Sequence, residues 1–284
     1  MPWEITHDVA LFQTAADEYL AADPLRCTVL LNVADRVRRQ GPFAFDDVQP
    51  ARFGWWRAEV GGTVAGAFVH TPPFRPSLGP MPDAAARALA LKWLSGGTAV
   101  AGVMGATAAA RALASEWTAR DGRWSVFRKQ RLYRLEELLL PPMDEDAEPR
   151  LATVRDVLLV SRWYEGFAVE SGQPAGRDYR AEAARRVGAG QIALWEVGRE
   201  PVSMAGFSPV VLGQGRVAPV YTPPELRGRG YAAGATAAAT AALLTAGAKD
   251  VLLFTDLANP TSNALYQRLG YRPVDDWVSL DFRS

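Results

Sequence analysis

Short apolar stretches separated by polar turns alternate along the chain with longer alanine-rich stretches, and this pattern predicts strands and helices. Residues 53–69 (FGWWRAEVGGTVAGAFV) and 192–208 (IALWEVGREPVSMAGFS) each indicate two strands joined by a glycine-containing turn. A helical stretch, a short apolar strand and another helical stretch follow in both halves, with the first helix at 83–94 and 230–244 and the strand at 99–105 and 251–256. The repeated order strand, strand, helix, strand, helix predicts two α/β units.

The segment LLLPPMDEDAEPR, residues 138–150, interrupts this pattern. It contains three prolines and four acids, so it can bury little and is typical of a linker or a long surface loop. An irregular loop inside one domain is the alternative. We expect a domain at 1–140, a linker at 141–150 and a second domain at 151–284.

Composition narrows the classes of partner. Acidic and basic residues are equal in number, at 31 each, so no global field favours nucleic acid or a membrane. The one cysteine, Cys27, excludes an internal disulfide and a multi-cysteine metal site, and no metal is predicted. Residues 1–23 carry acids without a continuous apolar run, so neither a signal peptide nor a membrane span is expected there. We expect a cytoplasmic monomer or homodimer, and the many alanines and arginines are typical of a bacterial GC-rich genome.

The stretch VYTPPELRGRGYA, residues 220–232, carries the candidate chemistry. An apolar strand ends at a double proline, and a glycine-arginine turn then opens into an alanine-rich helix that is expected to run from Tyr231 to Gly247. Gly228 and Gly230 allow close approach of a ligand, and the first helix amides have no intrahelical partner. This arrangement predicts a cradle for a phosphate or pyrophosphate. The first half has a similar TPP at 71–73 but no such turn.

The spacing of the turn separates three phosphate-binding motifs. A P-loop requires Gly-Lys-Ser/Thr, which is absent, and the match to a Rossmann fingerprint is loose. The spacing Arg227-x-x-Gly230-x-Ala232 instead resembles the Gln/Arg-x-x-Gly-x-Gly/Ala signature of the GNAT superfamily of acyl-CoA-dependent N-acyltransferases. Residues 251–274 (VLLFTDLANPTSNALYQRLGYRPV) resemble the next strand, helix and strand of that family. The resemblance covers 191–281 well, is thin for 151–190 and is only architectural in the first half.

The resemblance implies an α/β (α+β) fold of two GNAT-like units, each a mixed, mostly antiparallel central sheet flanked by helices. The N-terminal copy would be degenerate, and the C-terminal copy would bind acetyl-CoA. The implied reaction moves an acetyl group to the primary amine of a small molecule or peptide by direct attack. The alternatives are a tandem acetyltransferase similar to mycothiol synthase and an acyl-CoA-binding regulator without catalysis.

The resemblance also assigns residues to the acetyl-CoA site. These are Val220, Tyr221, Thr222, Arg227, Gly228, Arg229, Gly230, Tyr231, Ala232, Asn259, Ser262 and Tyr266. A strand amide released by a bulge near Val220–Thr222 would stabilise the oxyanion.

Two roles concern the residues near the chemistry. In the family, a tyrosine at the position of Tyr266 protonates the departing thiolate, and the alternative for Tyr266 is packing against the sheet. Asn259 is expected to cap a helix that has Pro260 at its first position, with or without a contact to the cofactor.

The sequence offers three candidates for the general base. Glu170 is the first candidate, and Asp256 and Glu196 follow. A role for each as a surface or capping acid, and a water relay without a dedicated base, stay open.

Overall fold

The strand–turn–strand segment forms a hairpin in both halves, as predicted. The structure is a computed structural model that describes residues 3–118, 123–141, 146–173 and 178–283. Strand β2 (Arg52–Arg57) pairs antiparallel with β3 (Val64–His70), and β8 (Ile192–Val197) pairs antiparallel with β9 (Glu200–Phe207).

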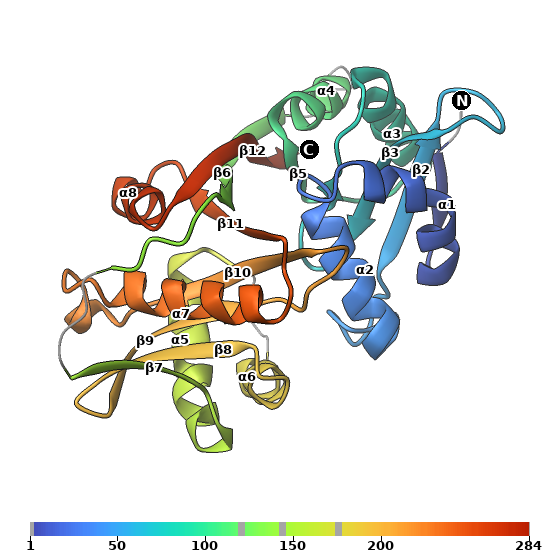
Figure 1. Cartoon of the computed structure of the whole chain (residues 1–284). Coiled ribbons are helices and arrows are strands. Elements are labelled where there is room, and N and C mark those ends of the chain that lie inside the picture. The colour runs from blue at the N-terminus through green and yellow to red at the C-terminus, as the bar shows by residue number, and fades with distance from the viewer. Residues whose placement is uncertain (1–2, 119–122, 142–145, 174–177, 284) are drawn as a thin grey trace. The chain divides into compact units, whose positions relative to one another are not determined.

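The chain divides into two compact units (Figure 1). Unit 1 comprises Met1–Leu132, Asp256–Ala258 and Val274–Ser284, and unit 2 comprises Tyr133–Thr255 and Asn259–Pro273. The further elements of the first half are β1 (Trp3–Thr6), α1 (Val9–Ala22), α2 (Thr28–Gln40), β4 (Ser77–Leu78), α3 (Asp83–Ser95), β5 (Gly102–Ala106), α4 (Thr107–Thr118) and β6 (Arg123–Leu135). Those of the second half are β7 (Ala147–Leu151), the 3₁₀ turn η1 (Val154–Asp156), α5 (Val157–Glu170), α6 (Tyr179–Gly188), β10 (Gln214–Tyr221), the 3₁₀ turn η2 (Pro224–Leu226), α7 (Tyr231–Thr245), β11 (Asp250–Asp256), α8 (Pro260–Arg268) and β12 (Tyr271–Arg283).

Apart from the two 3₁₀ turns, the helices and strands follow the same order in both halves: strand, two helices, three strands, helix, strand, helix, strand. This order extends the predicted repeat to the whole length of each half. The mixed sheet with flanking helices confirms the predicted α/β fold class, because most neighbouring strands are antiparallel and β10 and β11 are parallel.

The last strand of the chain does not stay with the elements that precede it. From Val274 onward β12 belongs to unit 1, where it pairs antiparallel with β5 and places Trp277 opposite Ala106. The strand order is β1-β2-β3-β4-β5-β12-β6 in unit 1 and, from the last residues of β6, β6-β11-β10-β9-β8-β7 in unit 2. The compact units therefore differ in extent from the expected ranges 1–140 and 151–284.

The expected linker at 141–150 is only partly described, because residues 142–145 lie outside the described residues. Its C-terminal part is the edge strand β7 instead of a loop, and Ala147 pairs with Val197 of β8. An edge strand tolerates Pro149, because one side of its backbone has no neighbouring strand to receive a hydrogen bond. The proline and acid content therefore marks a sheet edge at this position.

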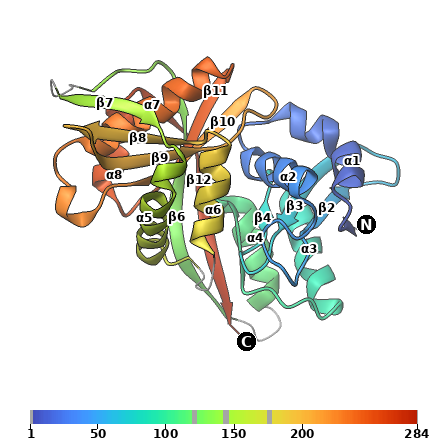
Figure 2. The same cartoon turned by 90° about the horizontal axis from the view of Figure 1, so that it is seen from below.

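Helices cover the two faces of the sheet in unit 2 (Figure 2). Ala193 and Trp195 of β8 belong to a buried cluster that includes the alanines of α7. Ile192 and Leu194 belong to a second cluster with side chains from α5 and α6. The side-chain period of two along a strand produces this division. The sheet is therefore buried on both faces between α7 and the pair α5 and α6.

Both predicted helix ends after the glycine-arginine turn are confirmed. Helix α7 starts at Tyr231 and is followed by Gly247 with φ of +87°. The Ala248 N–H donates to the Leu243 carbonyl at 3.0 Å, which closes the helix end in the manner of a Schellman motif. Gly270, with φ of +94°, follows the C-terminal end of α8.

A buried ion cluster joins β7, β8 and the start of α5. The Arg150 guanidinium donates to both oxygens of Asp156 at 2.7 and 2.9 Å and to Glu196 at 2.6 Å. Asp156 also accepts hydrogen bonds from the backbone and hydroxyl of Thr153 at 2.7 and 2.9 Å. The hydrogen bond from Arg150 lowers the pKa of Asp156 from 3.8 to about 2.

We expect this cluster to set the acid limit of stability. A carboxyl with a lowered folded-state pKa stabilises the fold fully above its unfolded pKa, and this contribution is lost as pH falls through the folded pKa. The ionised Asp156 should therefore contribute about 2 kcal/mol at pH 7. That contribution should decline between about pH 4 and pH 2.

Urea unfolding of the wild type and Asp156→Asn across this pH range measures the contribution. The difference in unfolding free energy should shrink as pH falls, whereas the exposed Glu165→Gln on α5 should show no such trend. A difference that is independent of pH would contradict the assignment.

Candidate functional site

Strands β10 and β11 run parallel for a short distance and then separate. Their pairing covers Gln214–Arg216 against Asp250–Leu252, whereas β10 continues to Tyr221 and β11 to Asp256. Beyond Arg216, the backbone groups on the edge of β10 that faces β11 are not paired with β11. Unpaired strand groups can hydrogen-bond an extended ligand, as they do when a peptide adds to a sheet edge.

A bulge lies on β10 where the strands separate. Val217 pairs with Phe207 and Val220 pairs with Ala205, so three steps on β10 face two steps on β9. An extra residue re-aims the backbone and is frequent beside active sites. The bulge was expected near Val220–Thr222, and the structure places it between Val217 and Val220.

The end of β10 is held by buried polar contacts. The Ser203 hydroxyl on β9 donates to the Tyr221 carbonyl at 3.1 Å and lies 2.8 Å from the Thr222 hydroxyl. The Arg227 side chain returns to the strand and donates from Nε to the Thr222 carbonyl at 2.9 Å. Tyr221 packs beneath α5, because Gly166 leaves room for its hydroxyl. These contacts give the strand end and the following turn a defined geometry.

The glycine-arginine turn has the conformation that its glycines permit. Gly228 and Gly230 have φ of +80° and +82°, in the left-handed region that favours glycine. A Cβ at either position would meet no atom within 4 Å, so the backbone is approachable from outside. Gly230 is the residue before α7, and no side chain caps that helix. The first amides of α7 therefore have no side-chain cap and lie at the positive end of the helix dipole.

The corresponding connection in unit 1 lacks this arrangement. Between β4 and α3 the chain runs through Gly79, Pro80 and Pro82, and the prolines remove backbone donors. A Cβ at Gly79 would collide with Tyr19, so this glycine is packed against protein. Only the second of the two equivalent connections combines free glycines with a helix start.

Glu170, the first candidate base, lies at the C-terminal end of α5. Both of its carboxylate oxygens accept hydrogen bonds from Arg227, at 2.6 and 2.8 Å. The two side chains are almost half exposed. The structure therefore brings Glu170 to the glycine-arginine turn and occupies its carboxylate there.

The other two candidate bases are engaged in structural contacts. Glu196 is buried and accepts the hydrogen bond from Arg150 described above. Asp256 belongs to unit 1, forms an ion pair with Arg128 at 3.2 Å and accepts a hydrogen bond from the Ala258 amide at 2.8 Å. Glu196 is therefore a buried ion-pair acid and not the expected surface or capping acid, and Asp256 is a partly exposed acid in an ion pair.

Asn259 caps α8, as predicted. Its side chain accepts a hydrogen bond from the Ser262 amide at 2.9 Å, with Pro260 at the first helical position. The same helix is supported by Tyr133 of β6, whose hydroxyl donates to Asn263 at 3.0 Å and accepts from Gln267 at 3.2 Å. Tyr133 is fully buried. The sequence pattern did not indicate that it supports α8, because its partners Asn263 and Gln267 lie far away in the chain.

Tyr266 is buried on α8 among apolar side chains. It belongs to the same cluster as Val217 and Ala233, against which Val220 and Tyr231 also pack. Its ring lies 6.2 Å from that of Tyr271 in an edge-to-face arrangement. Burial raises the pKa of Tyr266 to about 12. The phenol therefore stays protonated at neutral pH, as a proton donor must be.

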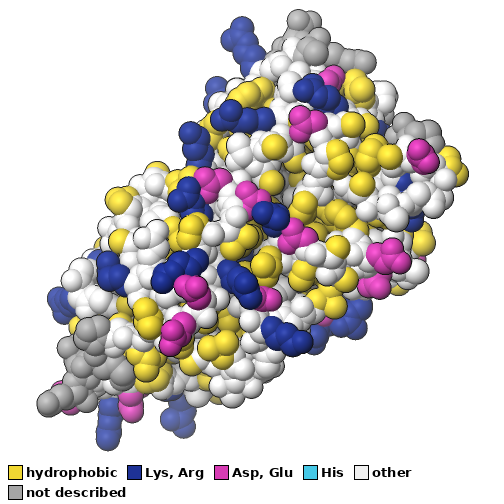
Figure 3. All heavy atoms as spheres, turned by 45° about the horizontal axis from the view of Figure 1, so that its top comes forward, with side chains coloured by type: hydrophobic (Ala, Val, Ile, Leu, Met, Phe, Trp, Pro, Cys, Tyr) yellow, Lys and Arg dark blue, Asp and Glu magenta, His cyan; other side chains and the backbone are white. Residues whose placement is uncertain are grey.

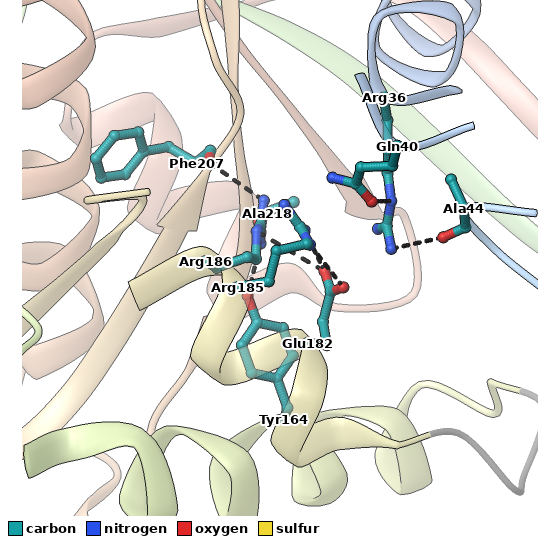
Figure 4. A network of polar contacts seen from close by, with 9 residues as sticks. All are labelled: Arg36, Gln40, Ala44, Tyr164, Glu182, Arg185, Arg186, Phe207 and Ala218. Carbon is teal, nitrogen blue, oxygen red and sulfur yellow. Dashed lines mark hydrogen bonds and ion pairs between the residues drawn. The ribbon is translucent and has the colours of Figure 1, made fainter. Parts of the chain in front are cut away.

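Sequence reasoning missed a polar network on the other face of β10 (Figure 4). Arg186 of α6 donates to the Tyr164 hydroxyl at 2.6 Å, to the Ala218 carbonyl in the bulge at 2.8 Å and to the Phe207 carbonyl at 3.2 Å. The sequence shows Arg186 as one of many arginines in a helical stretch. The sequence signal that could have identified Arg186 is a polar residue at a helix position that faces the core.

The charges on the surface and the metal-ligating side chains of the described residues do not indicate a further class of ligand. On the face shown in Figure 3, Lys and Arg side chains are interspersed with Asp and Glu. The described residues contain no group of three or more side chains placed to hold a metal ion. Across the same parts of the chain, no helix has the length and apolar character to cross a bilayer. Burial raises the pKa of the Cys27 thiol to about 12, so the thiol is protonated at neutral pH.

Comparison with known proteins finds a family match in the second half of the chain. Residues 158–271 match the model of the Acetyltransferase (GNAT) family. This match supports acyl-CoA-dependent N-acetyl transfer as the general class of reaction. No curated protein matches the chain.

Solved structures match the chain over nearly its whole length. A GCN5-related N-acetyltransferase from Sphaerobacter thermophilus is 17% identical, with a TM-score of 0.60 and coverage of 99% of this chain and 95% of that one. A tandem GNAT protein from the clavulanic acid biosynthesis pathway is 14% identical, with a TM-score of 0.60 and coverage of 99% and 98%. A Drosophila protein is 12% identical, with a TM-score of 0.66 and coverage of 98% of both chains. At these identities the likeness shows a shared tandem fold.

Proposed function

We propose that this chain, which contains a domain of the Acetyltransferase (GNAT) family at residues 158–271, transfers an acetyl group from acetyl-CoA to a primary amine by direct attack. The observation that carries the proposal is the separation of β10 from β11 beside the open glycine turn. An open strand edge and a helix N-terminus together fit an extended chain that ends in a pyrophosphate.

Acetyl-CoA would be held by backbone groups of unit 2. The amides from Gly228 to Ala232 would bind the pyrophosphate, with Arg229 exposed beside them. The open edge of β10 at Val220, Tyr221 and Thr222 would hydrogen-bond the pantetheine arm. Asn259 and Ser262, at the start of α8, would complete the site. Unit 1 lacks the free glycines, so we propose one acetyl-CoA site per chain.

The reacting atoms would lie at the bulge. A backbone N–H at Val220–Thr222 would stabilise the thioester oxygen as it gains negative charge under attack by the amine. The carbon–sulfur bond then breaks, and Tyr266 would donate its phenolic proton to the departing thiolate. Holding the amine and the thioester together in one site would supply the rest of the rate acceleration.

The proton of the ammonium substrate must leave before attack. Glu170 would accept it only after its contact with Arg227 loosens, and binding of the pyrophosphate near Arg227 offers a competing partner for that guanidinium. A water relay is the alternative that needs no such exchange.

Calorimetry and a CoA-release assay test the function together. We expect acetyl-CoA to bind with a stoichiometry of one per chain and CoA to be released when a suitable primary amine is present. Two equivalent sites would contradict the assignment to unit 2 alone. Tight binding without CoA release for any amine would favour an acyl-CoA-binding regulator, and faster release from a longer acyl-CoA would exclude acetyl-CoA as the preferred donor.

A further inference from the structure

Two arginines of unit 2 lie on the face of β10 opposite α7. A Cβ at Gly215 would collide with Leu243 of α7, so Gly215 faces that helix. Alternation along the strand directs the neighbouring Arg216 to the other face, which α5 and α6 cover. Arg186 of α6 lies on this face and interacts electrostatically with Arg216. The bulge begins at Val217, one residue after Arg216.

Neutral groups hold Arg186 in place. Its three hydrogen bonds go to a tyrosine hydroxyl and two backbone carbonyls (Figure 4), and its Nε is buried without a hydrogen bond from the described residues. The nearest carboxylate, Glu182, is 4.0 Å from that Nε. Glu182 accepts closer hydrogen bonds from Arg185, at 2.7 and 3.2 Å. Burial disfavours the charge of Arg186, but Tyr164 and the shared Glu182 outweigh it and raise the pKa of Arg186, so the charge is partly neutralised.

Arg216 is still less neutralised. Its backbone is fixed by Ser208, whose amide donates to the Arg216 carbonyl at 2.9 Å and whose hydroxyl accepts from the Arg216 amide at 3.0 Å. Its guanidinium has no hydrogen bond or ion pair with any residue that the structure describes. Burial, and then the like charge of Arg186, lower the pKa of Arg216 to about 10. Arg216 as a whole residue is partly exposed.

Two partly neutralised guanidinium groups on one face are unfavourable without an anion. Buried charges in proteins are ordinarily paired, because desolvation is costly unless a counter-charge offsets it. A guanidinium binds planar carboxylates and phosphates through two parallel hydrogen bonds. The pair beside the bulge therefore has the chemistry of an anion subsite.

We infer that the acetyl acceptor is an amine that also carries a carboxylate or phosphate group, which Arg216 binds while Arg186 adds a second positive charge. This inference rests on the proposed function, because the bulge is taken as the place of acetyl transfer. Arg216 and Val220 are four residues apart, and a strand rises about 3.3 Å per residue, so their Cα atoms lie at most about 13 Å apart. Small amino acids and aminoalkyl phosphates are shorter than this separation.

Matched pairs of acceptors test the inference. CoA release is measured with β-alanine against β-alaninamide and with 4-aminobutyrate against its amide for the carboxylate arm. Phosphoethanolamine against ethanolamine and glucosamine 6-phosphate against glucosamine form the phosphate arm. We expect kcat/KM to favour the anionic member of at least one pair by about tenfold or more, the value of one charge-assisted hydrogen bond.

Variants then assign the preference to the arginine. Arg216→Gln should lower kcat/KM for the anionic acceptor by about tenfold or more and leave the neutral acceptor nearly unchanged. Arg216→Lys should keep part of the preference because it keeps the charge. Arg180→Gln, a change at an exposed arginine of α6, should leave the preference intact.

Thermal unfolding and acetyl-CoA calorimetry separate the possible failures. Arg216→Gln should unfold at a higher temperature than the wild type, because it removes an unpaired charge next to Arg186, and should bind acetyl-CoA as the wild type does. Absence of any anionic preference, or a preference that survives in Arg216→Gln, would overturn the inference and leave the proposed function standing. Failure of the wild type to bind acetyl-CoA would overturn both.

Discussion

Tyr266→Phe is expected to lower kcat by ~10²–10⁴-fold, the range for loss of general acid–base assistance, while the affinity for acetyl-CoA changes little. The phenylalanine keeps the ring among the apolar side chains that surround Tyr266 and removes only the phenolic proton. No described residue hydrogen-bonds the Tyr266 hydroxyl, so the substitution leaves no buried protein group without its partner. Single-turnover kinetics with acetyl-CoA, in which chemistry is observed directly, provide the measurement.

Tyr271→Phe is the matched control. The Tyr271 hydroxyl lies 2.7 Å from that of Thr240, and its ring contacts Tyr266 in the same cluster. Its loss should reduce stability by about 1 kcal/mol and leave turnover nearly intact. Because the pKa of Tyr266 is raised to about 12, its proton should limit kcat only near pH 12, and no decline in kcat between pH 7 and 10 should depend on Tyr266. Wild-type turnover in Tyr266→Phe would assign protonation of the thiolate to solvent.

Gly230→Asp is expected to weaken acetyl-CoA binding by about 100-fold or more, the equivalent of two lost charge-assisted hydrogen bonds. The aspartate places bulk and negative charge where the pyrophosphate would meet the first amides of α7. It also forces a side chain into a φ of +82°, which costs roughly 1 kcal/mol or more of stability. Calorimetry with acetyl-CoA measures the affinity, and thermal unfolding measures the strain.

Two variants separate strain from charge. Gly230→Ala imposes the backbone strain without a charge and should weaken binding far less. Gly247→Asp makes the same chemical change at the other end of α7, where φ is +87° and a Cβ also meets no atom within 4 Å. It should destabilise the protein without weakening acetyl-CoA binding. Equal losses of affinity in Gly230→Asp and Gly247→Asp would refute a pyrophosphate site at the turn.

Signals between near neighbours in the sequence predicted the helix ends in the second half of the chain. The helix after the glycine-arginine turn begins at Tyr231 and ends before Gly247, and Asn259 caps the next helix, because these signals act within a few residues of each other. The hairpins followed from alternation of side chains along each strand. Edge position could not be deduced in the same way, so the proline-containing segment at β7 was expected to be a loop.

By itself, the sequence determined the repeated α/β units, the helix ends, the glycine turn and the place of Tyr266 on its helix, because propensity, capping and periodicity depend on near neighbours. Only the tertiary structure decided that β12 joins β5, that Arg227 binds Glu170 and that Arg186 and Arg216 share one face of β10. Each of these pairs joins residues at least 30 positions apart. Such contacts arise when packing of the sheet and helices brings distant residues together, and no local pattern in the chain encodes them.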